Sequence, residues 1–109
     1  MTGAALTEQD FRLEADRALE QAQHALLRLA DEEGFEVELQ NGVLQLIFED
    51  PAPAKFVVSP NAPVRQVWVS ARSRSYKLSW SGDASAFALD GERLSTLLER
   101  LAREHLQSA

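Results

Sequence analysis

The chain has 109 residues, a length that fits one domain with a real hydrophobic core and leaves no room for two. Hydrophobic residues make up 45% of it, but no apolar run approaches the roughly 20 residues that a membrane span needs. Cysteine is absent, which excludes disulfides, thiolate metal ligands and a cysteine nucleophile. The N-terminal residues lack the features of a secretory signal or a transit peptide, so we expect a cytoplasmic protein.

The net charge of −6 is unevenly distributed along the chain. Residues 1–50 hold twelve acids and three bases, whereas residues 51–109 hold five acids and eight bases. Such a dipolar molecule can attract cations at one end and an acidic protein surface at the other. The acidic half would repel phosphates, which argues against nucleic acid as a partner. The alternative is that the uneven charge distribution has no role in binding a partner.

The first predicted element is an amphipathic helix over residues 8–30. Thr7 and Asp10 form a capping-box start. Apolar residues then recur at spacings of three and four. They are Phe11, Ala15, Ala18, Leu19, Ala22, Leu26 and Leu29. Asp16, Glu20 and His24 are four residues apart and share one exposed stripe on the opposite side. An acidic link over residues 31–33 follows and ends at Gly34.

Short strands are predicted next. Residues 35–40 alternate between apolar and polar, and Asn41-Gly42 is a strong signal for a type I′ hairpin into a strand over residues 43–49. Pro60 and Pro63 mark a loop before the strand that contains Trp68. The remaining predicted strands cover residues 55–59, 76–80 and 85–89. Asp90 is predicted to cap a closing helix in which Leu94, Leu97, Leu98 and Leu101 share one face.

This order predicts an α+β two-layer sandwich. Connections of two to five residues imply an antiparallel sheet, because parallel crossovers need a dozen or more. Two helices with one apolar face each would cover one side of a five- to six-stranded sheet and leave the other side open to water. We expect residues 1–109 to form this single domain, with residues 1–6 as a flexible N-terminus.

The strand over residues 64–70 carries the most informative pattern. Val67 and Val69 share the face expected to point into the core, so Gln66, Trp68 and Ser70 are expected on the open face. An exposed indole with a donor N–H suits a recognition surface. The alternative is a tryptophan that rests on its neighbours without a partner. The bases Arg72, Arg74 and Lys77 follow around a turn and are predicted to share this docking surface, unless they form a solvated loop.

A set of acidic residues forms the second candidate site. Its members are Asp16, Glu20, His24, Asp31, Glu32, Glu33, Glu36 and Glu38. Carboxylates with one imidazole suit ferrous or ferric iron, manganese, calcium or magnesium. Because they lie along a surface, we expect weak, multi-site and salt-sensitive binding; the alternative is that they only solvate the helix. The sequence contains no G-x-S-x-G motif and no phosphate-binding loop. His105 falls near the end of the last helix, where an imidazole interacts favourably with the negative end of the helix dipole, so we interpret it as structural. We therefore expect no enzyme.

Several segments together resemble the frataxin family, including its bacterial CyaY branch. They are the acidic first helix, Asn41-Gly42-Val43-Leu44, Pro63-x-x-Gln66-Val67-Trp68-Val69, Trp80-Ser81-Gly82, and Asp90-Gly91 before a leucine-rich helix. The resemblance runs from Phe11 to the end of the chain. It implies the same fold and a role in iron handling and iron–sulfur cluster assembly. In that family the acidic ridge binds iron weakly, and the ridge and the sheet face around the tryptophan dock onto the cysteine desulfurase–scaffold complex.

The resemblance assigns roles to individual residues. Gln66 and Trp68 match the family's sheet residues, and Glu32, Glu36 and Glu38 occupy positions that are commonly acidic. The second half of the first helix is poorer in acids than the family pattern, with the apolar Leu27 on its exposed stripe. We expect a monomer, or an oligomer that forms with iron. The rival functions are a secretion-chaperone-like protein that dimerises and binds an unfolded effector, and a weak ferroxidase that needs Glu36 and Glu38.

Overall fold

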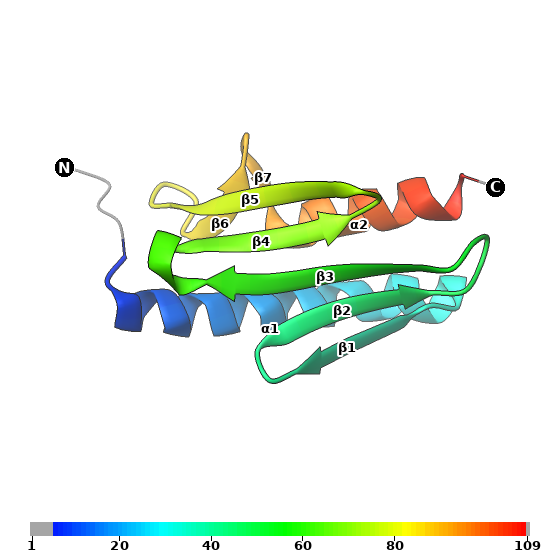
Figure 1. Cartoon of the computed structure of the whole chain (residues 1–109), viewed down its shortest axis with the longest axis horizontal. Helices are drawn as coiled ribbons and strands as arrows, with labels where there is room; N and C mark the ends of the chain where they lie inside the picture. Colours follow the sequence, from blue (N-terminus) through cyan, green and yellow to red (C-terminus); the bar gives the residue numbers. More distant parts are fainter. Residues whose placement is uncertain (1–5, 109) are drawn as a thin grey trace.

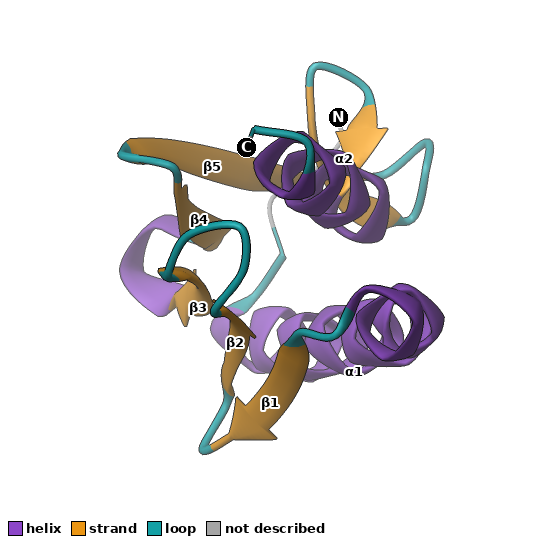
Figure 2. Cartoon of the chain, turned by 90° about the vertical axis from the view of Figure 1, so that its right-hand side faces the viewer, coloured by secondary structure: helices purple, strands orange, loops and turns teal. Residues whose placement is uncertain are grey.

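A seven-stranded antiparallel sheet forms one layer of the protein, and two helices form the other (Figure 1). The computed structural model describes residues 6–108. The segment predicted to be flexible, residues 1–6, lies outside the described residues except for Leu6. Neighbouring strands in the sheet are also neighbours in the sequence, from β1 to β7. Both helices lie on the same side of the sheet (Figure 2). The predicted two-layer α+β fold is confirmed, with a sheet that is wider than expected.

Helix α1 spans Glu8–Glu33. It begins as predicted, because the Thr7 hydroxyl oxygen accepts a 3.1 Å hydrogen bond from the backbone N–H of Asp10. Its end differs from the prediction: the acidic segment 31–33 is the last turn of the helix and not a link. Gly34 stops the helix because it adopts a left-handed conformation with φ of 82°, and its N–H donates to the carbonyl of Ala30.

The strands are β1 (Glu36–Gln40), β2 (Val43–Phe48), β3 (Ala54–Asn61), β4 (Gln66–Ala71), β5 (Arg74–Ser81), β6 (Ala86–Leu89) and β7 (Glu92–Arg93). Asn41 and Gly42 have φ of 52° and 75°, the positive values that a type I′ turn requires, so the predicted hairpin is confirmed. Pro60 was expected in a loop but lies in β3, where it pairs with Val67. Its fixed φ suits a strand, and near the strand end the missing N–H costs little. The 3₁₀ helix η1 (Ala62–Val64) follows.

Helix α2 spans Leu94–Leu106, and the predicted cap at Asp90 is wrong. Asp90 and Gly91 both have positive φ and form the turn that leads from β6 into the two-residue strand β7. An Asp-Gly pair suits such a turn as well as it suits a helix start, and here the turn adds one more strand. The residue at the N-cap is Arg93, which makes no side-chain capping bond. The four leucines predicted to share a face are all buried.

The core lies between the helices and one face of the sheet. Phe11 of α1 meets Phe87 of β6 edge to face, with ring centroids 5.6 Å apart. His105 is 7% exposed, and its Nε2 lies 3.0 Å from the carbonyl oxygen of Ala52. His105 therefore has a structural role, as expected, and it fills this role by contacting the backbone at Ala52. Trp80 is half-buried and packs on Phe87. Neither helix in residues 6–108 has a stretch apolar and long enough to cross a bilayer.

Candidate functional site

Strand β4 carries Trp68 on the face of the sheet that points away from helices α1 and α2. Its alternate residues Val67 and Val69 are 0% and 1% exposed because they point toward the helices. Trp68 points the other way and stays half-exposed. This is the placement that the alternating pattern predicts. The indole is thus part of the open face, which is turned toward the viewer in Figure 1.

The indole of Trp68 is held by two neighbours. Its Nε1–H donates a 2.9 Å hydrogen bond to Oε1 of Gln66, and Gln66 Nε2 lies 3.4 Å from Oγ of Ser79. The Nζ of Lys77 lies 4.9 Å from the centroid of the ring, which is cation–π geometry. The N–H that the sequence offers as a donor for a partner is therefore already engaged. For contact with a partner, the surface instead offers the fixed aromatic ring of Trp68 and the ammonium group of Lys77.

The sheet register shows which of the predicted docking residues lie together. Trp68 pairs with Ser59 on one side and with Lys77 on the other, and Ser70 pairs with Ser75. Alternation along β5 then places Arg74 on the opposite side, because it pairs with the buried Ala71. The structure therefore separates Arg74 from the surface that holds Trp68.

Two further placements complete this surface. Arg72 lies in the turn between β4 and β5, with φ of 53°, and is exposed. The prediction of one joint basic surface fails for Arg74, because side chains alternate along β5 and Arg74 lies three residues before Lys77, which places the two on opposite faces. Ser59 was missed as a neighbour of Trp68, and only the register between β3 and β4 reveals it.

The predicted metal ligands are all exposed. They are Asp16, Glu20 and His24 along α1, Asp31, Glu32 and Glu33 in its last turn, and Glu36 and Glu38 on β1. Within residues 6–108, no three acidic, histidine or cysteine side chains converge in a way that could hold a metal ion. Glu32 forms an ion pair with Arg28, with Nε and Oε2 3.7 Å apart. The acids thus form a negatively charged surface and not a preformed metal centre.

The acidic surface and the tryptophan surface meet on the open face. Glu38 of β1 pairs with Gln45 of β2, Gln45 pairs with Val57 of β3, and Val57 pairs with Ser70 of β4. These residues form one row across four strands, and three strand spacings amount to about 14 Å. The open face therefore runs from carboxylates at its β1 edge to the aromatic ring and Lys77, within the reach of one protein partner.

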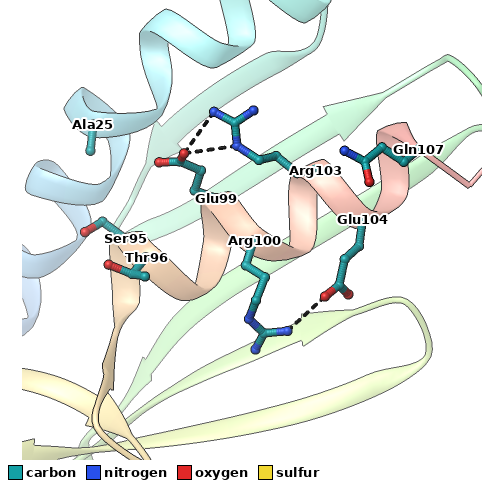
Figure 3. A pocket seen from close by; sticks show the side chains of 8 residues that line it. All are labelled: Ala25, Ser95, Thr96, Glu99, Arg100, Arg103, Glu104 and Gln107. Carbon is teal, nitrogen blue, oxygen red and sulfur yellow. Dashed lines mark hydrogen bonds and ion pairs between the residues drawn. The ribbon is translucent and has the colours of Figure 1, made fainter.

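A hollow of about 500 Å³ lies on the other layer, along α2 and beside Ala25 of α1 (Figure 3). Arg103 and Arg100 line it, but each pairs with a glutamate of the same helix, Glu99 and Glu104. Arg100 also forms a bidentate bond with Glu92 of β7, which lowers the pKa of that carboxyl. Because these charges compensate one another, this hollow offers little to a charged ligand.

Comparison with known proteins gives a consistent result. A model of the frataxin-like domain matches residues 4–108. The iron-sulfur cluster assembly protein CyaY of Janthinobacterium sp. is 30% identical over 98 residues, which cover 88% of this chain and 87% of that protein. CyaY of Pseudomonas syringae pv. syringae is 35% identical over 78 residues, which cover 68% and 69%. The solved structure of frataxin from Psychromonas ingrahamii superposes with a TM-score of 0.65 at 16% identity, covering 91% of this chain and 90% of that one, and shows a shared fold.

Proposed function

The chain belongs to the frataxin-like family, and from this membership we propose that it is an accessory protein of iron–sulfur cluster assembly. Its relatives in Janthinobacterium and Pseudomonas carry that role in their names. The observation that supports it most is the open sheet face, on which Trp68 is fixed between Gln66 and Lys77. The proposed role is regulatory and non-catalytic: the protein binds the assembly machinery and modulates it.

The proposed partner is the complex of a cysteine desulfurase with the scaffold protein on which the cluster is built. A fixed aromatic side chain suits docking because it buries much apolar area and loses little rotamer freedom on binding. Trp68 meets this description, since Gln66 and Lys77 restrain its ring in the free protein. Lys77 adds a positive charge at the same point, which favours an acidic patch on the partner.

The acidic surface has a second proposed role, the weak binding of iron as cargo. Glu36, Glu38 and the acids of the last turn of α1 are exposed carboxylates of the kind that iron binds. Their dispersal favours several weak sites over one tight one. This arrangement also speaks against a ferroxidase, because a redox centre needs ligands fixed around one point. The same charges suit a basic surface on the desulfurase.

One NMR experiment tests both parts of the proposal. The ¹⁵N-labelled chain is titrated first with ferrous iron under nitrogen and then with the desulfurase–scaffold complex. We expect iron to shift amides in residues 31–38, and the complex to broaden those of β4 and β5 as well. A titration in which the complex leaves the open face unperturbed contradicts the docking proposal. Iron shifts confined to residues outside the acidic surface contradict the second part.

A further inference from the structure

A second hollow, of about 260 Å³, lies on the helix side of the sheet, between the first half of α1, strands β5 and β6, and the start of α2. It adjoins the hollow along α2 and shares Ser95 with it. Ala18 and Ala22 of α1 and Phe87 of β6 line it with apolar surface. The ring of Trp80 also lines it and packs on Phe87, with ring centroids 5.3 Å apart. The hollow therefore has an apolar and partly aromatic wall.

The charged residues of the lining leave one positive charge uncompensated. They are Glu14, Arg17 and Arg93. Arg17 pairs with Glu14, with Nη1 and Oε2 3.6 Å apart, so these two charges compensate each other. Arg93 is exposed and, within residues 6–108, forms no ion pair and no side-chain hydrogen bond. In the hollow along α2, by contrast, each arginine pairs with a glutamate. A ligand in the second hollow would therefore meet a guanidinium that has no partner.

We propose that this hollow binds a small organic monoanion, a carboxylate attached to an aromatic ring. The carboxylate would pair with Arg93, whose planar guanidinium presents N–H donors in a fork that matches two carboxylate oxygens. The ring would lie against Trp80 and Phe87, because aromatic pairs gain more than their buried area alone provides. Ser95 and Gln21 also line the hollow, and their hydroxyl and amide groups supply further donors. The charge of Arg93 sets the sign of the ligand, since a hydroxyl and an amide can donate or accept.

Other ligands fit this hollow less well. Inorganic phosphate would pair with Arg93 but leave the apolar wall without a contact. A neutral aromatic molecule would use the wall but leave the guanidinium unpaired, and a cation would be repelled by the net positive charge of the lining. Pockets for drug-sized ligands begin at about 300 Å³, so this hollow suits a smaller molecule. It lies on the opposite side of the sheet from Trp68, so the inference does not rest on the proposed docking role.

The two tryptophans provide an internal control, because Trp80 lines the hollow whereas Trp68 lies on the open face. Each indole N–H gives its own NMR signal. The ¹⁵N-labelled chain is titrated at neutral pH and low ionic strength with benzoate, with its neutral isostere benzamide, and with inorganic phosphate. We expect benzoate to shift the indole signal of Trp80 in a saturable way, to leave that of Trp68 in place, and to bind more tightly than the other two probes. Equal affinity for benzamide or for phosphate overturns the proposal, and so do equal shifts of both indole signals.

Two matched variants separate a built site from general attraction to positive charge. Arg93→Gln removes the uncompensated charge of the hollow. Arg74→Gln removes another exposed arginine that forms no ion pair in the described part of the chain, six residues before Trp80 and therefore about 20 Å away along β5. We expect Arg93→Gln to weaken benzoate binding about fivefold, the upper range for an exposed ion pair, and Arg74→Gln to leave it unchanged. Equal weakening by both variants overturns the proposal.

A third variant tests the location of the ligand. Ala18 is half-buried in the wall that α1 contributes, and Ala18→Leu fills the hollow with a residue that favours a helix nearly as well as alanine. We expect this variant to abolish the shift of the Trp80 indole by benzoate. An unchanged affinity means that benzoate binds elsewhere and overturns the proposal. The dispersed amide spectrum of each variant checks that it is folded.

Discussion

The indole N–H of Trp68 donates to the side-chain oxygen of Gln66, two residues earlier on the same face of β4, at 2.9 Å. Residues at this spacing in a strand point to the same side, so this bond closes within one strand and needs no helix or loop to support it. It fixes the ring in the free protein before any partner arrives. The open face therefore presents a preorganised aromatic surface, and this has consequences that can be measured.

Replacing Trp68 by alanine is expected to weaken docking without unfolding the protein. The ring lies on the open face, so we expect the free energy of unfolding to change by no more than about 1 kcal/mol. Binding to the desulfurase–scaffold complex should weaken by about 2 kcal/mol if the ring is a hot spot. Calorimetric titration measures the second effect and urea unfolding the first. Arg74→Ala is the control and should leave the affinity unchanged, because Arg74 lies on the other side of the sheet. If Trp68→Ala also leaves the affinity unchanged, the docking proposal is wrong.

Replacing Gln66 by leucine is expected to release the ring while keeping the size of the neighbour. The indole N–H then loses its acceptor, so its hydrogen exchange with water should become faster and its NMR order parameter lower. Gln66→Glu retains a side-chain oxygen and should keep the exchange slow. Docking should weaken by about 1 kcal/mol for the leucine variant, since the ring must then be ordered on binding. Indole exchange that is equally slow in both variants shows that Gln66 does not hold the ring.

Replacing Gly34 by alanine tests whether a left-handed residue is needed to end helix α1. Its φ is 82°, and an added Cβ would meet nothing within 4 Å, so Gly34→Ala adds backbone strain alone. We expect the free energy of unfolding to fall by about 1–2 kcal/mol, the cost of a left-handed conformation for other residues. Gly82→Ala is the matched control, because its surroundings are equally open and its φ is not in the positive range. The two variants should differ in urea unfolding, and equal stabilities would show that Gly34 bears no strain.

The errors of the sequence-based expectations share a physical origin. Asn41-Gly42 and the alternation around Trp68 are strong local signals, and the structure agrees with both. Asp90-Gly91 is ambiguous, because the same pair suits a hairpin turn and a helix start, and only pairing with β6 decides. The side of the sheet on which Arg74 lies depends on the length of the two-residue turn between β4 and β5. A turn longer or shorter by one residue would place the Arg74 side chain on the opposite side. Hydrogen bonds such as that of Trp68 depend on rotamers, which no residue pattern contains.

The ion pair of Arg100 with Glu92 predicts a pH dependence of stability. The hydrogen bond from Arg100 and its charge lower the pKa of the Glu92 carboxyl below its ordinary value of 4.5. A lowered folded-state pKa means that the stabilisation is present above pH 4.5 and is lost as the pH falls through the folded-state value. The pair is largely exposed, so we expect its contribution to remain below about 1 kcal/mol.

The variant Glu92→Gln tests this dependence. Its free energy of unfolding should be lower than that of the wild type at pH 7, and the difference should narrow on acidification below the ordinary pKa of 4.5. Urea unfolding at several pH values measures both. Glu104→Gln removes the other partner of Arg100 but leaves the bidentate bond to Glu92, so it should preserve most of the pH effect. A difference between wild type and Glu92→Gln that is independent of pH would contradict the ionic origin of the stabilisation.

Removal of single carboxylates is expected to weaken iron binding only slightly. In residues 6–108 no three candidate ligands converge, so each acid contributes to the local negative potential and not to a fixed coordination sphere. Glu36→Gln should therefore lower the affinity for ferrous iron about twofold, and raising the ionic strength should lower it further, because salt screens exposed charges. Anaerobic calorimetry of the wild type and of Asp16→Gln, Glu36→Gln and Glu33→Gln measures these changes. A preorganised site would respond differently, since loss of one ligand or its support commonly costs ten- to a hundredfold or so in affinity. A loss of that size in one variant alone would show that iron itself gathers the carboxylates into a defined site, and the description of this surface as a diffuse negative patch would then be wrong.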